Sequence, residues 1–193
     1  MSFDPGFGAC VFLSFISTII FAIIYLIRHG NKLKYLFGAL FSVYLIFAMS
    51  YTICPIYFNS AMRESFFESG WKVTDCIYLV PFKDGITWDD WLNVILTFPF
   101  GFMLPLIKRR FTWRHAVVSG LGFGLAVELI QLLTAILQGF TFKYVDTSDV
   151  ICNFVGTMLG WSVIEGFILL VQRKCKDGNS GSLVNYLVER IVK

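Results

Sequence analysis

Five polar residues interrupt a stretch of sequence that is otherwise apolar enough for a membrane. Glu128 and Gln131 lie inside one long apolar run, and Asp146, Asp149 and Asn153 follow across a short loop. Acidic residues in such segments are costly and usually face a protein interior or a water-filled cavity. Carboxylate and amide groups can bind amines, ions or hydrogen-bond donors, and a carboxylate can also transfer a proton. These residues therefore form the candidate site.

The composition predicts the class of protein that carries this site. Of the 193 residues, 56% are hydrophobic, 18% are aromatic and only 15% are charged. Soluble domains are about 45–50% apolar and about a quarter charged. Because the apolar residues come in long blocks, we expect an all-α polytopic membrane bundle. No basic patch is interleaved with aromatic residues and no glycine-rich phosphate loop is present, so nucleic acid is not an expected partner.

Metal and cofactor chemistry finds little support. The histidines His29 and His115 both stand next to basic residues, and the cysteines form no CxxC pair. A zinc site needs such clustered ligands, so we predict no metal and no cofactor. Free thiols are the expected state of the cysteines, which are Cys10, Cys54, Cys76, Cys152 and Cys175.

Five membrane spans are predicted, and they cover residues 8–27, 35–54, 92–107, 116–137 and 150–171. The third is short and contains Pro99, Gly101 and Pro105. Since each proline lacks an N–H group and frees a carbonyl, we expect a broken helix that protein or a wet cavity must satisfy. The loop over 55–91 should hold a short interfacial helix around Met62 and Phe66.

The predicted domain organisation is one transmembrane domain over 1–176, followed by a tail over 177–193. Paired apolar positions recur along the tail, which predicts an amphipathic helix on the inner leaflet. Basic residues set the expected orientation, since cytoplasmic loops are rich in lysine and arginine. They cluster after spans one, three and five, which predicts an N-terminus outside and a C-terminus inside; the clustered residues are Arg28, Lys32, Lys34, Lys108, Arg109, Arg110, Arg114, Arg173, Lys174 and Lys176.

This orientation brings the polar residues together. Glu128 lies nine residues before the outer end of span four, which is roughly 13 Å deep at about 1.5 Å per residue. Asn93 starts span three at a similar level, so a ligand site is expected in the outer half of the membrane. It comprises Asn93, Glu128, Gln131, Asp146, Asp149 and Asn153. The same faces carry glycines that should pack span four against span five, namely Gly120, Gly124, Gly156 and Gly160.

Other roles stay open for these residues. Glu128 could serve only as a hydrogen-bonded link between helices, although such links are worth only about 0.6 kcal/mol on average. Asp146 and Asp149 could cap the N-terminus of span five, where aspartate is favoured. Asn153 and Gln131 could be structural.

The order of these motifs resembles the VanZ-like family over about residues 79–165. The first half of the resemblance consists of Leu79-Val80-Pro81-Phe82, Asn93-x5-Pro99-x-Gly101 and Pro105. The second half consists of Glu128-x2-Gln131 and Asp146-x2-Asp149-x3-Asn153-x2-Gly156-x3-Gly160. Lys143 departs from the family pattern, which has an arginine a few residues before the aspartate pair. Lysine is a point charge and does not bind a carboxylate or phosphate through two parallel bonds as arginine does.

The resemblance implies an integral protein of the bacterial cell membrane linked to glycopeptide resistance, chiefly to teicoplanin. It names no biochemical activity, and three hypotheses remain. The outward-facing polar pocket would bind an envelope lipid, a lipoglycopeptide, another amphipathic ligand or an ion. Alternatively, an intramembrane enzyme would modify a lipid or cell-wall precursor with Glu128 as its acid–base group. In the third hypothesis the chain is a structural or assembly protein without a ligand.

Overall fold

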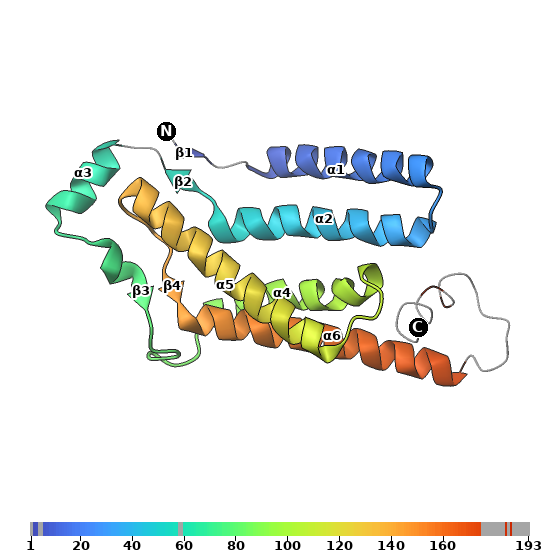
Figure 1. Cartoon of the computed structure of the whole chain (residues 1–193). Coiled ribbons are helices and arrows are strands. Elements are labelled where there is room, and N and C mark those ends of the chain that lie inside the picture. Colours follow the sequence, from blue (N-terminus) through green and yellow to red (C-terminus); the bar gives the residue numbers. More distant parts are fainter. Residues whose placement is uncertain (1, 4–5, 58–59, 175–183, 185, 187–193) are drawn as a thin grey trace.

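In the computed structural model, which describes residues 2–3, 6–57, 60–174, 184 and 186, the chain is a bundle of long α-helices (Figure 1). In chain order the elements are β1 (Ser2–Phe3), α1 (Gly6–Arg28), α2 (Lys32–Ile53), β2 (Ile56–Tyr57), α3 (Ser60–Glu68), the 3₁₀ turn η1 (Val73–Cys76), β3 (Ile77–Tyr78), α4 (Trp88–Ile107), α5 (Trp113–Gln138), β4 (Val145–Asp146) and α6 (Thr147–Lys174). Five of the helices, α1, α2, α4, α5 and α6, are long and apolar enough to cross a membrane. The predicted all-α bundle with five spans is confirmed.

Local sequence signals fix where the helices begin and end. The Asn31 side chain accepts a hydrogen bond from the backbone N–H of Leu33 and caps α2. At the start of α4 the Asp90 carboxylate accepts a bond of 2.6 Å from the backbone N–H of Thr87, which closes a capping box. Gly139 ends α5 in the left-handed conformation, at φ 75°, which glycine adopts without strain.

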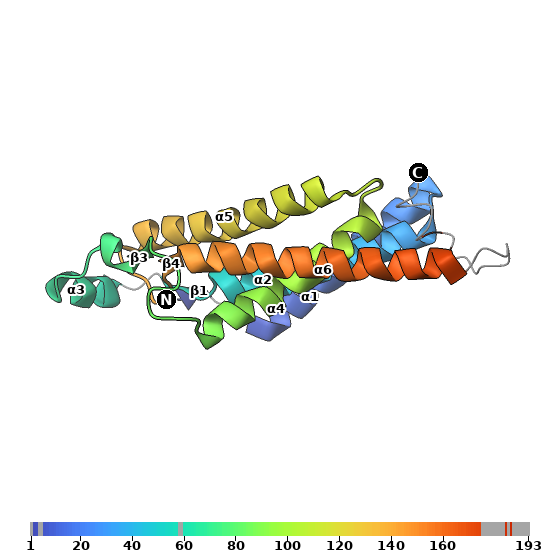
Figure 2. The same ribbon diagram turned by 90° about the horizontal axis from the view of Figure 1, so that it is seen from below.

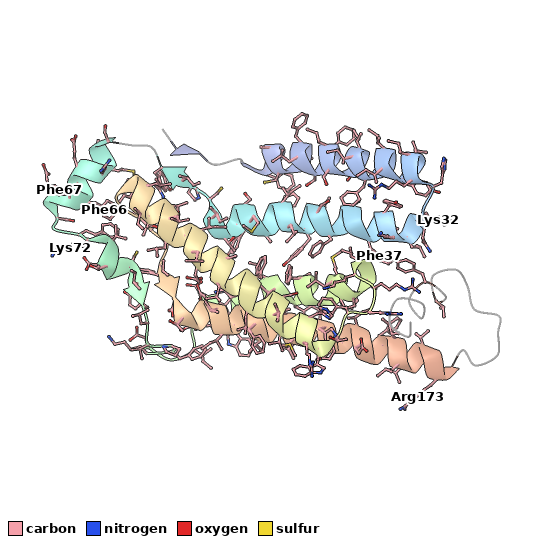
Figure 3. All side chains as sticks on the ribbon, viewed as in Figure 1. Lys32, Phe37, Phe66, Phe67, Lys72 and Arg173 are labelled. Carbon is pink, nitrogen blue, oxygen red and sulfur yellow. The ribbon has the colours of Figure 1, made fainter. Side chains whose placement is uncertain are left out.

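The bundle has two distinct ends. The loop end carries α3, the short strands and the loop over residues 79–87, and the basic end carries the α1–α2 and α4–α5 turns (Figures 1 and 2). Lys32 and Arg173 lie at the basic end and Lys72 lies at the loop end (Figure 3). The basic clusters on which the predicted orientation rests thus share one end of the structure. The orientation across a membrane stays a prediction.

Helix α6 packs closely against both α4 and α5. A Cβ atom at Gly101 of α4 would meet the backbone carbonyl of Thr157, and one at Gly160 of α6 would meet the backbone of Phe98 and Phe102. Small residues let membrane helices approach to this degree. The strand pair β3–β4 is parallel, with Tyr78 opposite Asp146, and it places the starts of α4 and α6 at the same end.

The prediction that the glycines of spans four and five pack against one another is wrong, because the two pairs of glycines face different helices. Gly120 and Gly124 of α5 do face α6, where a Cβ atom would approach Thr157 and Val150 within 3.0 and 3.1 Å. Gly156 and Gly160 instead face α4. The reason is that α6 lies between two helices, so the small residues on its two sides serve different neighbours.

The expected break in the third span is also wrong, because α4 is one continuous helix through Pro99 and Pro105. The hydroxyl of Tyr44, on α2, donates a bond of 2.7 Å to the carbonyl of Leu96 and is also hydrogen-bonded to the backbone of Phe100. A side chain inserted into the helical ladder can satisfy groups that a proline disturbs. A neighbouring helix therefore supports the proline-containing turn from outside.

Aromatic side chains hold α3 against the end of α5. The rings of Phe66 and Phe140 stack at 5.0 Å, and Phe140 is fully buried. Trp71 and Phe142 meet Phe66 edge-on. The predicted short helix around Met62 and Phe66 is confirmed as α3, while its location at a membrane interface stays a prediction.

The predicted amphipathic tail helix over 177–193 lies outside the described residues except at Val184 and Tyr186. Tyr186 is buried against Leu106, Ile164 and Ile168, and its ring stacks on Phe37 at 5.8 Å. Its hydroxyl donates a bond of 2.6 Å to the carbonyl of Leu106. At this residue the tail therefore contacts the basic end of the bundle.

The glycine contacts predict opposite effects for two similar substitutions. Gly101→Ala places a methyl group against the Thr157 backbone, and we expect it to destabilise the bundle by about 1–3 kcal/mol. Gly122→Ala meets nothing within 4 Å, so the better helix propensity of alanine should leave stability equal or raised. Unfolding of the purified variants in detergent measures both. Equal stability of the two variants would contradict the backbone contact between α4 and α6.

Candidate functional site

A cavity of about 1010 Å³ lies at the loop end of the bundle. Its wall is formed by the ends of α1, α2, α4, α5 and α6 and by the loops over residues 79–87 and 139–146. Four of the six predicted ligand residues line it, namely Asn93, Gln131, Asp146 and Asp149. The remaining two, Glu128 and Asn153, are buried and do not line it.

Glu128 lies behind the cavity wall instead of in it. The residue is 6% exposed, and its Oε2 accepts a hydrogen bond of 2.9 Å from the backbone N–H of Asp146. Its other oxygen, Oε1, has no hydrogen-bond partner among the described residues. The Glu128 carboxylate therefore holds the start of α6 against α5.

The two aspartates of α6 and its preceding strand have different surroundings. The Asp146 Oδ1 accepts a bond of 2.7 Å from the backbone N–H of Ser148, as expected of a helix cap. The Asp149 side chain is hydrogen-bonded to Asn93 of α4. Asp149 thus joins α4 to α6 at the cavity, and Asp146 combines the capping role with the bond from its N–H to Glu128.

The Leu79–Phe82 segment is held beside these aspartates by its backbone. The Thr147 hydroxyl donates to the carbonyls of Tyr78 and Leu79 at 3.2 and 3.3 Å. The Ser148 hydroxyl accepts a bond of 2.9 Å from the N–H of Phe82. These bonds position the loop over residues 79–87, which forms one wall of the cavity.

Gln131 connects α5 to α2. Its Nε2 donates a bond of 2.9 Å to the backbone carbonyl of Thr52, and its Oε1 is without a hydrogen-bond partner among the described residues. The residue is buried and also lines the cavity. Asn153, on α6, is 2% exposed and its Oδ1 likewise has no partner in the described part of the chain.

Lys143 is half-buried and bonds the end of α2. Its ammonium donates a bond of 2.9 Å to the carbonyl of Tyr51 and lies 5.7 Å from the centre of the Tyr51 ring. Burial holds the pKa of this ammonium below its usual value, because leaving water disfavours the charged form. A cation near the last carbonyls of a helix is favourable. Lys143 therefore acts first as a cap for α2.

Sequence reasoning missed the acidic residues at the start of α4. Asp89 and Asp90 both line the cavity, and Asp90 is 6% exposed. The Cys152 thiol of α6 lies 3.8 Å from Asp90 Oδ1. The Thr87-x2-Asp90 spacing is a capping-box signal, and with Asn93 one turn further it marks an acidic face that points to the same site.

The cavity combines a charged wall with an apolar one. Its lining includes five carboxylates, those of Asp84, Asp89, Asp90, Asp146 and Asp149, and the ammonium groups of Lys83 and Lys143. Phe7, Phe47 and Tyr51, from α1 and α2, line another part of it. A cationic or hydrogen-bond-donating group suits the first wall and a hydrocarbon group suits the second.

Chemistry that depends on histidine or on a bound metal ion has less support at the cavity. His29 follows α1 and His115 lies in the first turn of α5, so both are at the basic end. Among the cysteines within the described ranges, Cys10, Cys76 and Cys152 are free thiols. Across the described residues, no group of three or more histidine, cysteine, aspartate or glutamate side chains is placed to hold a metal ion.

Comparisons with known proteins agree with the motif order. The family model described as VanZ/LLP1 matches residues 41–170, well over half of the chain. The match begins within α2 and ends near the end of α6, so it includes every helix of the cavity except α1. No curated protein and no solved structure matches the chain. The resemblance drawn from the sequence is confirmed, and the chain belongs to the VanZ/LLP1 family of multi-pass membrane proteins.

Proposed function

We propose that the cavity at the loop end binds an amphipathic ligand of the cell envelope that carries a cationic group. The observation that supports this most is the joining of an acidic wall and an apolar wall in one cavity. Small-molecule sites have volumes of about 300–1,000 Å³ and few polar groups that fix the ligand's orientation. A cavity of about 1010 Å³ can hold a headgroup together with part of a chain.

The acidic wall supports the cationic part of this proposal. Asp149 is held by Asn93 and Asp90 by Thr87, so both carboxylates are oriented before a ligand arrives. The nearby Lys143 ammonium is bonded to the Tyr51 carbonyl, where it serves α2. Preorganised groups bind with less loss of side-chain freedom. An ammonium group is the natural partner of such a wall.

The apolar wall supports the amphipathic part. Phe7 and Phe47 come from α1 and α2, and their rings lie 5.9 Å apart. They stand at the start of α1 and near the end of α2, beside the loop end. A hydrocarbon chain that lies along these helices would leave its headgroup close to Asp89 and Asp149. Envelope lipids and lipoglycopeptides both have such a two-part character.

The charge pattern supports an extracellular site. Under the positive-inside rule the basic end faces the cytoplasm, and the loop end then faces the exterior of a bacterial cell membrane. Membership of the VanZ/LLP1 family accords with a role in resistance to teicoplanin-type glycopeptides. In this proposal the chain contributes to resistance by holding the antibiotic or the envelope component on which the antibiotic acts.

An intramembrane enzyme is the second hypothesis, and the geometry favours it less. Glu128, the acid–base candidate, lies behind Asp146 and does not line the cavity. Both histidines lie at the opposite end of the bundle. The third hypothesis, a purely structural role, does not account for an acidic wall that is open to a cavity. Mass spectrometry of lipid precursors after incubation with the purified protein tests for turnover.

The proposed orientation can be checked with single cysteines. In a chain whose native cysteines are replaced by serine, we expect Tyr144→Cys to react with a membrane-impermeant thiol reagent added to intact cells. Tyr144 lies in the loop over residues 139–146 and is 59% exposed. Arg110→Cys, in the turn at the basic end, serves as the control and should react only after the cells are opened. The reverse pattern would contradict the outward-facing site.

The link to resistance is tested in bacterial cells that express the chain. Because Glu128 fixes α6 and Asp149 lines the cavity, we expect Glu128→Gln with Asp149→Asn to restore susceptibility to lipoglycopeptides at equal expression. Glu64→Gln removes an exposed carboxylate of α3 that does not line this cavity, and it should keep resistance. Unchanged susceptibility of the double variant would contradict the resistance role.

Charge recognition is tested by binding to protein reconstituted in lipid nanodiscs. A long-chain alkylamine probe should bind more tightly than the alcohol of the same chain length. Asp149→Asn should weaken alkylamine binding by about tenfold, which equals about 1.4 kcal/mol, and should leave binding of the alcohol unchanged. Glu64→Gln should alter neither. If the amine and the alcohol bound equally well to the unaltered protein, the acidic wall would have no part in recognition.

A further inference from the structure

Three buried oxygen atoms lie behind the cavity without hydrogen-bond partners in the part of the chain that the structure describes. They are Glu128 Oε1, Gln131 Oε1 and Asn153 Oδ1. The three residues are 6%, 8% and 2% exposed, respectively. Buried acceptors are almost always paired, so an unpaired set indicates an ion, a water molecule or another group that completes it.

The register of α5 against α6 places Asn153 and Glu128 on facing helix surfaces, and Gln131 continues the same face of α5. A Cβ atom at Gly124 would lie 3.3 Å from Asn153 Cβ, so Asn153 faces α5 at the level of Gly124. Glu128 is one helical turn from Gly124 on the same face, and Gln131 is three residues further. Side chains on a helix lean towards its N-terminus, which tilts Glu128 back towards Asn153. The bond from Asp146 N–H holds Glu128 in this place.

The orientation of Gln131 is set by its other amide atom. Its Nε2 donates a bond of 2.9 Å to the Thr52 carbonyl, so a reversed amide would bring two oxygens together. The amide oxygen of Gln131 therefore belongs to the unpaired set. Since Gln131 also lines the cavity, it connects the buried oxygens with a route of entry.

The chemistry of the three atoms is that of hard cation ligands. One carboxylate oxygen and two neutral amide oxygens carry a single negative charge between them, which a monovalent cation balances. Calcium and magnesium sites use oxygen ligands as well, usually with several carboxylates. Within the described ranges no set of three or more acidic, histidine or cysteine side chains is placed for a metal ion. The composition of this set thus suits an alkali cation.

We propose that Glu128, Gln131 and Asn153 form a binding site for a monovalent alkali cation at the back of the cavity, distinct from its acidic wall. The cation compensates the buried Glu128 carboxylate, which lies within electrostatic range of Asp146 and Asp149. It leaves the lining carboxylates free for the proposed amphipathic ligand. The site goes beyond the proposed function and does not depend on it.

Thermal unfolding of the purified protein tests this site. The melting temperature of the unaltered protein and of Asp149→Asn is measured in NaCl, in KCl and in choline chloride at equal ionic strength. Choline is too large for the buried site, and Asp149→Asn weakens its binding to the acidic wall. At an alkali cation concentration about ten times its dissociation constant, we expect the midpoint to rise by about 3–6 °C over choline. A rise in either alkali salt supports the site. Equal midpoints in all three salts would overturn it and assign the three oxygens to water.

Two substitutions separate this site from a general salt effect. Glu128→Gln keeps the size of the side chain and its acceptor for Asp146 N–H, and it should abolish the shift. Asp90→Asn also removes a carboxylate that is 6% exposed, but at a place outside the three oxygens, and should keep the shift. A shift that persists in Glu128→Gln would overturn the proposal.

A direct measurement covers the case in which Glu128→Gln does not fold. Sodium NMR of the unaltered protein should show line broadening that excess potassium reverses and that choline does not. Asn153→Ala, which removes one of the three oxygens, should reduce the broadening. No broadening with the unaltered protein would overturn the site. Alkylamine binding measured in a low-salt buffer without sodium, potassium or choline is independent of all these outcomes, so the two proposals can fail separately.

Discussion

The close backbone contact between α4 and α6 is the constraint on which the loop end depends. Gly101, Gly156 and Gly160 each lie against backbone atoms of the other helix, where a Cβ atom would not fit. In a bilayer such packing replaces the hydrophobic effect as the force that joins helices. The two helices run in parallel, and the β3–β4 pairing sets their starts at one level. The N-terminal turns of α4 and α6, both rich in aspartate, are therefore held side by side.

This arrangement explains why so much negative charge can gather at one place. Aspartate at a helix N-terminus is stabilised by the unpaired backbone N–H groups and by the helix dipole. Asp90 is bonded to Thr87 in one such turn, and the Asp146 carboxylate to the Ser148 N–H in the other. Two parallel helices supply two of these positive ends to the same cavity. Glu128 extends the same principle, since it accepts a bond from a backbone N–H just before α6.

The sequence was sufficient to predict the spans, which follow from hydropathy, and four of the residues that line the cavity, which follow from helical periodicity. It could not show which neighbour Gly156 and Gly160 face, because periodicity gives a face of α6 and not its partner. The predicted break at Pro99 was wrong for a related reason. The helix is continuous there, and the Tyr44 hydroxyl that bonds its backbone comes from another helix, which the local sequence does not reveal. Glu128 was expected to line the pocket but lies behind its wall. The position of Glu128 along α5 could be derived from the sequence, whereas the position of the Asp146 backbone that covers it could not. Asp90 was missed although its capping signal was readable.

The position of Lys143 bears on what the cavity can bind. The resemblance to the VanZ-like family leads us to expect an arginine a few residues before the aspartate pair, and an arginine could bridge two carboxylates or bind an anion. Lys143 instead donates its hydrogen bond to the Tyr51 carbonyl at the end of α2. Asp149 and Asp89 are within its electrostatic range, but its hydrogen bond goes to α2. The acidic wall is thus only partly compensated by the protein's own cations, and in low-dielectric surroundings such a wall favours a cation from outside. The same charge pattern therefore argues against an anionic headgroup as the ligand and for one that carries an amine.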